Sequence, residues 1–442
     1  MPYKVLMVAP TSFFYDNGCH VRILEEIRAL QEGGHQITVC TYHMGNNIDG
    51  VDVQRSLDVP WKRGAQVGSS RHKIYFDAVL ALKSFQVALR QKPDIIHAHL
   101  HEGALIGGML KLLKFGRMPL VFDFQGSMTS EMVDHHFLNP EGFFYKPAVK
   151  LENFINHLPD LIITSTYNSA NILKNKFGIN PEQVITLTDR VNSNIFKPYT
   201  SPEEREIAEH TRRELNIPPG KKVVIYLGVL APYQGTDHLL EAAAMLKHEA
   251  PDLHFVIMGY PGVDSYRELA NYLGLGDRVI FPGRIPYQEA ARMLSIGDIA
   301  VAPKMSATEG AGKITNYMAM GIPTVAFDTP VSRELMGEDG IYAKYGDARS
   351  LADNIKMLAQ NESLRQVLAQ KLRARALTEM SWKQGREQLE GIYDRAISRY
   401  RKNEQQTASS SANGSKLNFS ADSSSETISG KMLERGEAST SL

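Results

Sequence analysis

The sequence of 442 residues contains only two cysteines, Cys19 and Cys40, and no surplus of charge of either sign. Two cysteines cannot build a disulfide framework, and their spacing is not one that zinc sites use. The 49 basic residues are balanced by 49 acidic ones, which argues against a protein that coats nucleic acid. There is no apolar run of about 18 residues and no basic, apolar leader, so we expect a cytoplasmic protein without a membrane-spanning segment.

The composition is otherwise that of a folded globular protein, with 43% hydrophobic and 22% charged residues. The length predicts two or three domains. Residues 403–442 are rich in serine and poor in large apolar side chains, a composition that buries too little surface to offset the entropy of ordering. We therefore predict a disordered C-terminal tail over 403–442.

Two segments of the chain share the layout of strand, glycine-bearing loop, helix and strand. Apolar runs at 5–9 and 223–227 are typical of buried strands, and Ile23, Ile27 and Leu30 lie on one face of the first intervening helix. Further strands are predicted at 37–39, 95–98, 119–124, 161–165 and 184–187, and at 253–257, 279–281, 299–302 and 324–326. This alternation predicts an α/β protein in which two Rossmann-like domains, each with a parallel sheet, face a cleft.

The proposed domain boundaries follow from changes in composition. We predict an N-terminal Rossmann-like domain over 1–198 and a C-terminal Rossmann-like domain over 199–380. The polar, proline-bearing stretch 197–222 is the predicted linker between them. A helix over 381–402, with Leu389, Ile392 and Tyr393 on one face, is predicted to pack back across the domains.

A candidate anion site lies where the strand at 299–302 leads into a glycine-flanked loop and a helix that begins at 311–313. The free backbone N–H groups and the dipole of a helix start attract a diphosphate. Gly310 and Gly312 allow a ligand to approach the backbone closely. A simple turn from strand to helix explains this segment equally well when it is considered by itself.

The segment 309–323 resembles the donor-binding signature of the family 4 glycosyltransferases, which are retaining enzymes of the GT-B fold. It begins with Glu309, Gly310, Ala311 and Gly312 and continues through Asn316 to the sequence Met-Gly-Ile-Pro. Other segments match the family in the same order: Gly18 before the first helix, 93–99, 188–192, 196–198, 228–235, 279–284 and Trp382. The resemblance covers residues 3–400.

The resemblance implies transfer of a sugar, with retention and without a metal or a cofactor, from a nucleoside diphosphate donor to an acceptor hydroxyl. Electrostatic stabilisation of the leaving diphosphate then depends on the protein itself. The resemblance places Glu309 and His99 beside the donor sugar as catalytic candidates. With the resemblance, 1–198 becomes the acceptor-side domain and 199–380 the nucleotide-sugar donor domain. The resemblance also implies these donor-binding residues: Gly310, Ala311 and Gly312 at the phosphates, Asn316 at the ribose, Gly235 and Gly259 near the nucleotide, and Arg284 beside the base.

The sequence departs from the family pattern where the leaving group is held. The family usually places an arginine and a lysine in the segment 228–235, and the matching residues here are Val229 and Gln234. We predict that Lys313, then Lys304 and Arg190, supply the missing positive charge. A second departure is Asn316, because the family usually has a glutamate at the ribose.

Polar residues of the N-terminal half are candidates for binding the acceptor. Asn17 and Gly18 precede the first helix, and Asp123 and Gln125 end a predicted strand. Parallel strands end at the same edge of a sheet, so these residues are expected to face the cleft. The acceptor is a carbohydrate or a lipid-linked molecule that the sequence does not identify.

Several alternatives remain open from sequence. His97, His99 and His101 alternate along an expected strand and share one side of it, which is a spacing that metal ligands also use. Residues 62–117 contain ten basic and three acidic residues between apolar runs, as expected of helices on an anionic membrane or of ordinary solvated helices. A non-hydrolysing nucleotide-sugar epimerase and a non-catalytic sugar-binding module are the alternative functions.

Overall fold

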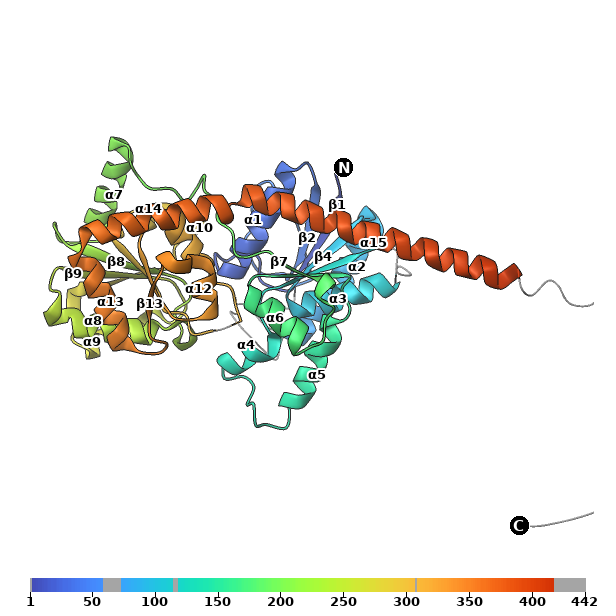
Figure 1. The fold of residues 1–442 in the computed structure, drawn as a ribbon, viewed down its shortest axis with the longest axis horizontal. Coiled ribbons are helices and arrows are strands. Elements are labelled where there is room, and N and C mark those ends of the chain that lie inside the picture. The colour runs from blue at the N-terminus through green and yellow to red at the C-terminus, as the bar shows by residue number, and fades with distance from the viewer. Residues whose placement is uncertain (1, 59–72, 114–117, 307, 417–442) are drawn as a thin grey trace, which may run out of the picture. The chain divides into compact units, whose positions relative to one another are not determined.

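Parallel strands alternate with helices throughout the computed structural model, which describes residues 2–58, 73–113, 118–306 and 308–416, with side chains as far as Arg401. The first sheet has the strand order β3-β2-β1-β4-β5-β6-β7 (Figure 1). Its strands are β1 Lys4–Ala9, β2 Gln36–Thr41, β3 Asp52–Arg55, β4 Ile95–His99, β5 Leu120–Phe124, β6 Leu161–Thr164 and β7 Val184–Thr186. All neighbouring strands are parallel, and the central strands are buried along almost their whole length, as expected of a sheet covered on both faces.

Helices cover both faces of this first sheet, and together they form the N-terminal domain. The helices are α1 Gly18–Glu32, α2 Lys73–Gln91, α3 Leu100–Leu113, α4 Met128–Asp134, α5 Tyr145–Asn156 and α6 Tyr167–Asn175. Apolar side chains of α1 pack on one face, in a core that includes Ile23 and Ile27. Side chains of α2, α3, α5 and α6 form a separate core on the other face.

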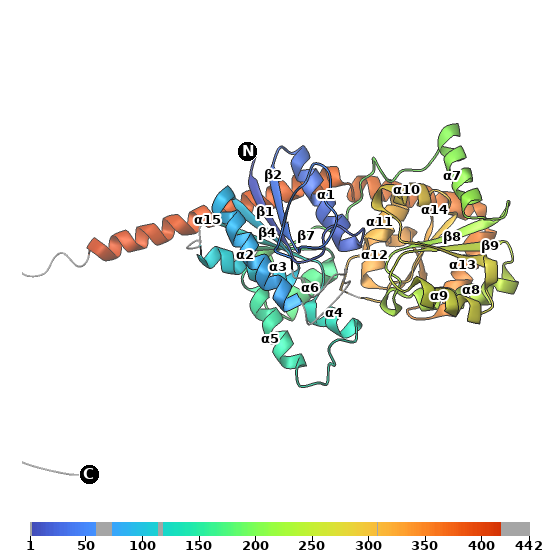
Figure 2. The same ribbon diagram turned by 180° about the vertical axis from the view of Figure 1, so that it is seen from behind.

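The second sheet has the strand order β10-β9-β8-β11-β12-β13 and is also parallel (Figure 2). Its strands are β8 Lys222–Leu227, β9 Leu253–Met258, β10 Val279–Gly283, β11 Ile299–Ala302, β12 Thr324–Phe327 and β13 Ile341–Ala343. The helices that follow or precede them are α7 Pro202–Glu214, α8 Thr236–Glu249, α9 Val263–Tyr272, α10 Tyr287–Leu294, α11 Gly312–Ala319, α12 Pro330–Met336, α13 Ala348–Gln360 and α14 Glu362–Glu379. This sheet and its helices form the C-terminal domain, and the predicted α/β class with two Rossmann-like domains is confirmed.

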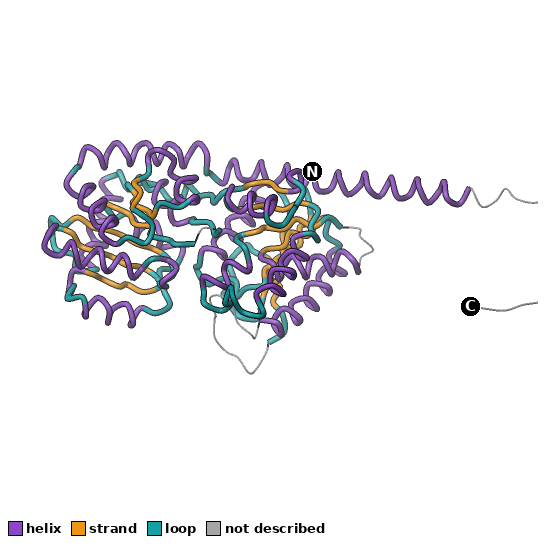
Figure 3. Tube along the Cα trace, turned by 60° about the horizontal axis from the view of Figure 1, so that its bottom comes forward, coloured by secondary structure: helices purple, strands orange, loops and turns teal. Residues whose placement is uncertain are grey.

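The last helix, α15 Trp382–Lys416, returns to the first sheet, and the tube view in Figure 3 shows its length. Tyr393 is buried, and its hydroxyl lies 2.7 Å from Nδ1 of His97 on β4. Residues 1–397 form one compact unit, and 398–442 form a second unit that contains the rest of α15. The helix extends beyond its predicted end at 402, and residues 417–442 of the predicted tail lie outside the described residues. The domain boundaries at 198 and 380 stay predictions.

The stretch 197–222 contains helix α7 at its centre, and its role as the linker stays a prediction. Ser201 and Glu204 form a capping box at the start of this helix, with Pro202 at its first position. His101 does not continue the β4 strand with His97 and His99, since the chain turns at Leu100 and His101 belongs to helix α3.

Candidate functional site

Loops at the carboxyl ends of both sheets enclose a cavity of about 370 Å³. This is the edge at which parallel α/β sheets bind ligands. Residues that come from both domains line it, including these candidates predicted from the sequence: Asn17, Gly18, Gln125, Arg190, Gly259, Lys304, Glu309, Gly310, Ala311, Gly312, Lys313 and Asn316. Four other candidates, His99, Asp123, Gly235 and Arg284, are not among the described residues that line the cavity.

The start of helix α11 forms one wall of the cavity. The first residue of this helix is Gly312. The residue before it, Ala311, has no side-chain atom that could cap the helix. A β-carbon on Gly310 would lie 2.3 Å from Oδ2 of Asp189, so glycine is required for the close approach of these two segments. The carboxylate of Asp189 also accepts a hydrogen bond from the backbone of Ala311. Asp189 therefore occupies part of the positive end of the helix, and the rest faces the cavity.

Lys313 lies against Gly228 and Gln234, in the segment where the resemblance leads one to expect an arginine and a lysine. Its Nζ is 2.9 Å from Oε1 of Gln234 and 3.1 Å from the hydroxyl of Tyr226, and it lies 4.3 Å from the centre of that ring. A β-carbon on Gly228 would be only 2.5 Å from the same ammonium group. Burial, followed by repulsion from Lys304, lowers the pKa of Lys313 well below its ordinary value. An anion that entered this part of the cavity would stabilise the charged form.

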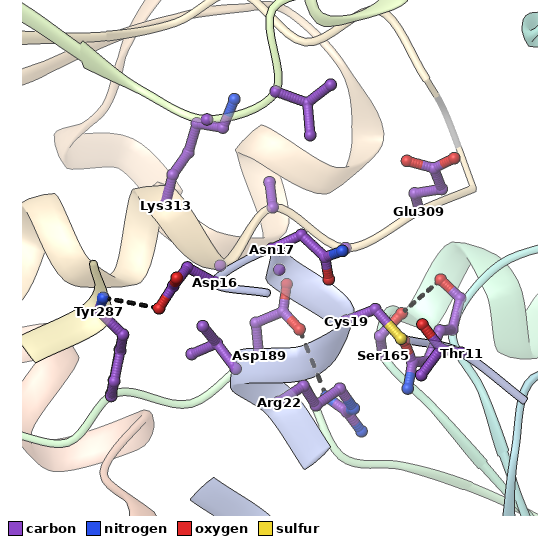
Figure 4. Close-up of a pocket in the computed structure, with 18 of the residues that line it drawn as sticks. Thr11, Asp16, Asn17, Cys19, Arg22, Ser165, Asp189, Tyr287, Glu309 and Lys313 are labelled. Atoms are coloured by element: carbon purple, nitrogen blue, oxygen red, sulfur yellow. Dashed lines mark hydrogen bonds and ion pairs between the residues drawn. The ribbon is translucent and has the colours of Figure 1, made fainter. Parts of the chain in front are cut away.

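Glu309 and Lys304 form an ion pair in the loop between β11 and α11. Nζ of Lys304 lies 2.7 Å from Oε2 of Glu309 and donates to the carbonyl oxygen of Gly310 at 2.6 Å. Burial alone would raise the pKa of Glu309, but the attraction and hydrogen bond of Lys304, together with the nearby His135 and Lys313, hold the pKa below its ordinary value. Glu309 is therefore an anion on the cavity wall. Figure 4 shows it together with Lys313, which lies at the start of α11, the helix that follows this loop.

Asp123 and His99 lie behind the cavity wall, which corrects their predicted positions facing the ligand. The guanidinium of Arg22 binds both carboxylate oxygens of Asp123, at 2.9 and 3.0 Å. The same group reaches Oδ1 of Asp189 at 3.3 Å (Figure 4). Nδ1 of His99 lies 3.2 Å from Asp123, and both residues are fully buried. Burial would raise the pKa of Asp123, but Arg22 and His99 together lower it further than burial raises it, so Asp123 is an anion.

A second set of contacts surrounds the histidines. The rings of His97 and His99 stack with their centres 4.5 Å apart, and each Nε2 lies 3.9 Å from Oε2 of Glu26. These three side chains and Asp123 have potential ligand atoms within 4.8 Å of one another, as do Glu131, His135 and Glu309 at the cavity. In both groups a basic side chain already compensates a carboxylate, namely Arg22 in the first and Lys304 in the second. His101 contacts Glu152 instead, so the three alternating histidines do not form a common metal site.

Arg190 and Arg284 are engaged by other protein groups. Arg190 lines the cavity, but its guanidinium donates to the carbonyl oxygen of Glu379 at 2.7 Å and to Gln388 at 2.6 Å. These contacts do not support Arg190 as a substitute cation. Arg284 binds the carboxylate of Asp16 and lies between the rings of Tyr15 and Tyr260, outside the cavity lining.

Two glycines keep the loops of the second sheet close together. A β-carbon on Gly235 would lie 1.9 Å from the carbonyl oxygen of Pro303, and Gly235 has a positive φ of 74°. A β-carbon on Gly259 would lie 1.7 Å from the carbonyl oxygen of Gly228. Gly235 therefore has a packing role behind the cavity, whereas Gly259 both packs and lines it.

The N-terminal domain supplies the other wall. Asn17 caps helix α1 by accepting from the backbone N–H of His20 at 3.1 Å, so part of its side chain is already in use. Gln125 donates to Asp123 at 2.9 Å and still lines the cavity. Glu131 from α4 adds a carboxyl group to this wall, and burial, followed by repulsion from Glu309, raises its pKa to about 8.

The charged residues of the site that sequence reasoning missed include Arg22, Glu131 and Asp189. Arg22 lies one helical turn after Gly18, so helical spacing could have placed it beside the cavity. Asp189 precedes the predicted candidate Arg190 directly. Nothing in the sequence near Glu131 indicates that it faces Glu309, because the two residues belong to different domains.

Models of two protein families match the chain. The model described as Glycosyltransferase Family 4 matches residues 16–188, and the model described as Glycosyl transferases group 1 matches 208–375. D-inositol 3-phosphate glycosyltransferase of Corynebacterium glutamicum is 25% identical over 315 residues, which cover 69% of this chain and 72% of the relative. Sulfoquinovosyl transferase of Arabidopsis thaliana is 24% identical over 377 residues, which cover 83% of this chain and 69% of the relative.

Solved structures share the fold at lower identity. Sucrose-phosphate synthase from Thermosynechococcus elongatus has a TM-score of 0.74 with 16% identity, covering 90% of this chain and 99% of that one. HepE from Anabaena, in complex with UDP and glucose, has a TM-score of 0.70 with 18% identity, covering 89% of this chain and 99% of that one.

Proposed function

Because the chain belongs to the family 4 glycosyltransferases and has their GT-B fold, we propose that it transfers a sugar from a nucleoside diphosphate donor, bound in the cavity, to an acceptor hydroxyl. The proposed reaction breaks the bond between the anomeric carbon and the diphosphate. The acceptor oxygen forms its new bond on the same face of the sugar, which retains the anomeric configuration. We further propose that no metal or cofactor takes part.

The observation that carries this proposal is the position of Lys313. Its ammonium group lies against Gly228 and Gln234, in the loop where the family usually places its arginine and lysine. The start of α11, with Gly310 and Gly312, faces the same space. A cation and a helix start that converge on one point suit a diphosphate whose negative charge grows as the sugar departs.

Other residues have roles that follow from their placement. Glu309 is ionised and held by Lys304, so it is suited to orient hydroxyls of the donor sugar. Asn316 follows Gly312 by one turn of α11 and lines the cavity, which supports its assignment to the ribose. Lys304 reaches the cavity but already neutralises Glu309, so Lys313 is the stronger candidate for the phosphates.

The donor is proposed to be a nucleotide sugar, with UDP-sugars as the first to test. Support comes from HepE, a GT-B protein whose structures contain UDP with glucose or UDP-glucose. The acceptor stays open between a carbohydrate and a lipid-linked molecule. The name of one relative gives D-inositol 3-phosphate, and the name of the other gives only the transferred sulfoquinovosyl group, so the names do not favour one acceptor for this chain.

Product analysis tests the reaction. The full chain is incubated with UDP-, GDP- and ADP-sugars and a panel of acceptors, with and without EDTA, and the anomeric signals of the products are read by NMR. The proposal expects release of the nucleoside diphosphate and a retained configuration, unaffected by EDTA. A changed nucleotide sugar without an acceptor would indicate an epimerase, and binding without turnover would indicate a non-catalytic module.

Lys313→Ala should weaken nucleoside diphosphate binding about tenfold to a hundredfold, because a charge-assisted contact to phosphate is lost. Calorimetric titration or the shift of thermal unfolding with nucleotide measures the change. Lys344→Ala is the matched control, since Lys344 lies in the same domain and its side chain is 81% exposed. Equal affinities of the Lys313 variant and the wild type would remove Lys313 from the proposed site.

A further inference from the structure

The outer surface of three helices in the N-terminal domain is unusually apolar. It exposes Ile74 and Leu82 from α2, Met109 and Leu112 from α3, and Leu151 and Phe154 from α5. The turn before α5 adds Phe143 and Phe144, with exposed fractions of 86% and 73%. We call these eight residues the α2–α3–α5 face. Soluble monomers rarely expose so many large apolar side chains together.

The three helices lie in one layer. Helix α3 packs against α2 on one side and against α5 on the other (Figure 2). Their inner side chains, including Phe76, Ile106 and Ile155, form the core on the first sheet. These helices are therefore apolar toward the sheet, and on the outside they expose large apolar side chains among basic ones, a combination typical of helices at a membrane interface.

The acidic and the basic residues of this layer differ in whether the protein itself binds them. Each of its three acidic residues is bound by the protein itself: Asp77 by the hydroxyl of Tyr42 at 2.5 Å, Glu102 by Lys73 at 2.6 Å, and Glu152 by Ser127 at 2.7 Å. Four basic residues, Lys83, Arg90, Lys146 and Lys150, have no ion pair with any residue that the structure describes. The turn before α5 adds one exposed acidic residue, Glu141, so these four basic residues still outnumber the exposed acid and the charge presented to a partner is positive.

We propose that the α2–α3–α5 face docks on an anionic lipid bilayer, with Phe143 and Phe144 entering the interfacial region and the four basic residues facing lipid phosphates. Aromatic and aliphatic side chains next to unpaired cations are the combination that interfacial helices use. A large part of this face, α5 and the turn before it, lies outside the stretch 62–117 in which sequence alone indicated a membrane contact. Residues 62–72 and 114–117 of that stretch lie outside the described residues.

The face is connected to the cavity through the same helices. Lys73 and Phe76 of α2 and Leu100 of α3 line the cavity. Docking would thus hold the acceptor side of the cavity next to the membrane. The docking itself depends on the surface alone, so it can be tested without knowing the donor, the acceptor or the reaction.

Sedimentation with vesicles tests the proposal on the full-length protein. Wild type should sediment with vesicles that contain phosphatidylglycerol and much less with vesicles of phosphatidylcholine alone, and added salt should weaken binding. Phe143→Ser with Phe144→Ser should lower the bound fraction at least about fivefold. Lys146→Glu with Lys150→Glu should lower affinity by about fivefold or more for each charge.

The control is Tyr272→Ser, because Tyr272 is an isolated aromatic residue of the C-terminal domain with an exposed fraction of 88%. This variant should bind vesicles like the wild type, and circular dichroism should show that all variants are folded. Failure of the wild type to sediment with anionic vesicles would overturn the proposal. A concentration-dependent dimer that Phe143→Ser with Phe144→Ser dissociates, without vesicle binding, would assign the face to a second copy of the chain instead.

Discussion

The ionisation state of single residues in the cavity depends on residues of the other domain. Glu131 from α4 faces Glu309 from the loop before α11, with Lys73 and Glu102 on its own side and Lys304 on the opposite side. Burial and Glu309 raise the pKa of Glu131 to about 8, whereas Lys304 keeps Glu309 ionised. At neutral pH this pair thus consists of one protonated and one ionised carboxyl group, which can donate to and accept from sugar hydroxyls.

Glu131→Gln should change how the free energy of unfolding depends on pH. An ordinary pKa of 4.5 in the unfolded chain and about 8 in the folded one mean that the wild type loses stability as the pH rises through this interval. Glutamine cannot ionise, so the variant should avoid about 2 kcal/mol of this loss between about pH 5 and pH 9, a value reduced for solvent screening.

Urea unfolding of both proteins at the two pH values measures the difference. Glu141→Gln is the control, because Glu141 is exposed in the turn before α5. If wild type and Glu131→Gln lose equal stability with rising pH, Glu131 does not titrate in the proposed range.

At the scale of elements, the start of α11 depends on two glycines with different surroundings. Gly310 has Asp189 against it, whereas a β-carbon on Gly312 would find its nearest neighbour, Oδ2 of Asp189, at 3.8 Å. Both positions are glycines, and they are two residues apart in the sequence. They nevertheless predict opposite results for the same substitution.

Gly310→Ala should lower the free energy of unfolding by about 1–3 kcal/mol, because the new methyl group must displace Asp189 or the loop. Gly312→Ala should change it by less than about 0.5 kcal/mol, since alanine is accepted well in a helix. Urea unfolding monitored by circular dichroism compares the two variants. Similar losses for both would show that the contact of Gly310 with Asp189 is not the cause.

The regular elements could be predicted from the sequence where one physical pattern dominates. Fully apolar runs such as 5–9 and 299–302 are interior strands of the sheets, as expected. Strands β3 and β13 were not predicted, because they are short edge strands with mostly half-buried residues and little apolar pattern. Helix α7 was interpreted as a linker because its interior is polar, although Ser201 and Glu204 signal a helix start.

The whole molecule determines the parts of the site that sequence reasoning did not find. Arg22 binds Asp123 and Asp189 across 101 and 167 residues of sequence, and only the fold brings them together. The resemblance to the family identified the loop that contains Glu309 and Lys313. It did not reveal that Arg22 would bind Asp123 and hold it, with His99, behind the cavity wall.

Deleting the C-terminal part of α15 tests its role in the whole molecule. A chain that ends at Arg401 should unfold within about 1 kcal/mol of the wild type, since the large buried side chains of α15 end at Ile397. A chain that ends at Gln388 loses Leu389, Ile392 and Tyr393 and should lose more than about 4 kcal/mol. Thermal unfolding of the two chains gives the comparison, and equal stability would mean that α15 does not hold the first sheet.

The chain passes between its two sheets twice, and the two passages lie next to each other. The N–H of Val191 donates to the carbonyl oxygen of Met380 at 2.8 Å, and the N–H of Trp382 donates to that of Val191 at 3.2 Å. Val191 and Ser381 form a parallel bridge. The two crossings are therefore tied to each other by backbone hydrogen bonds, so neither crossing can shift without the other, and a change at 380–382 would be transmitted directly to Asp189 and Arg190 on the cavity wall.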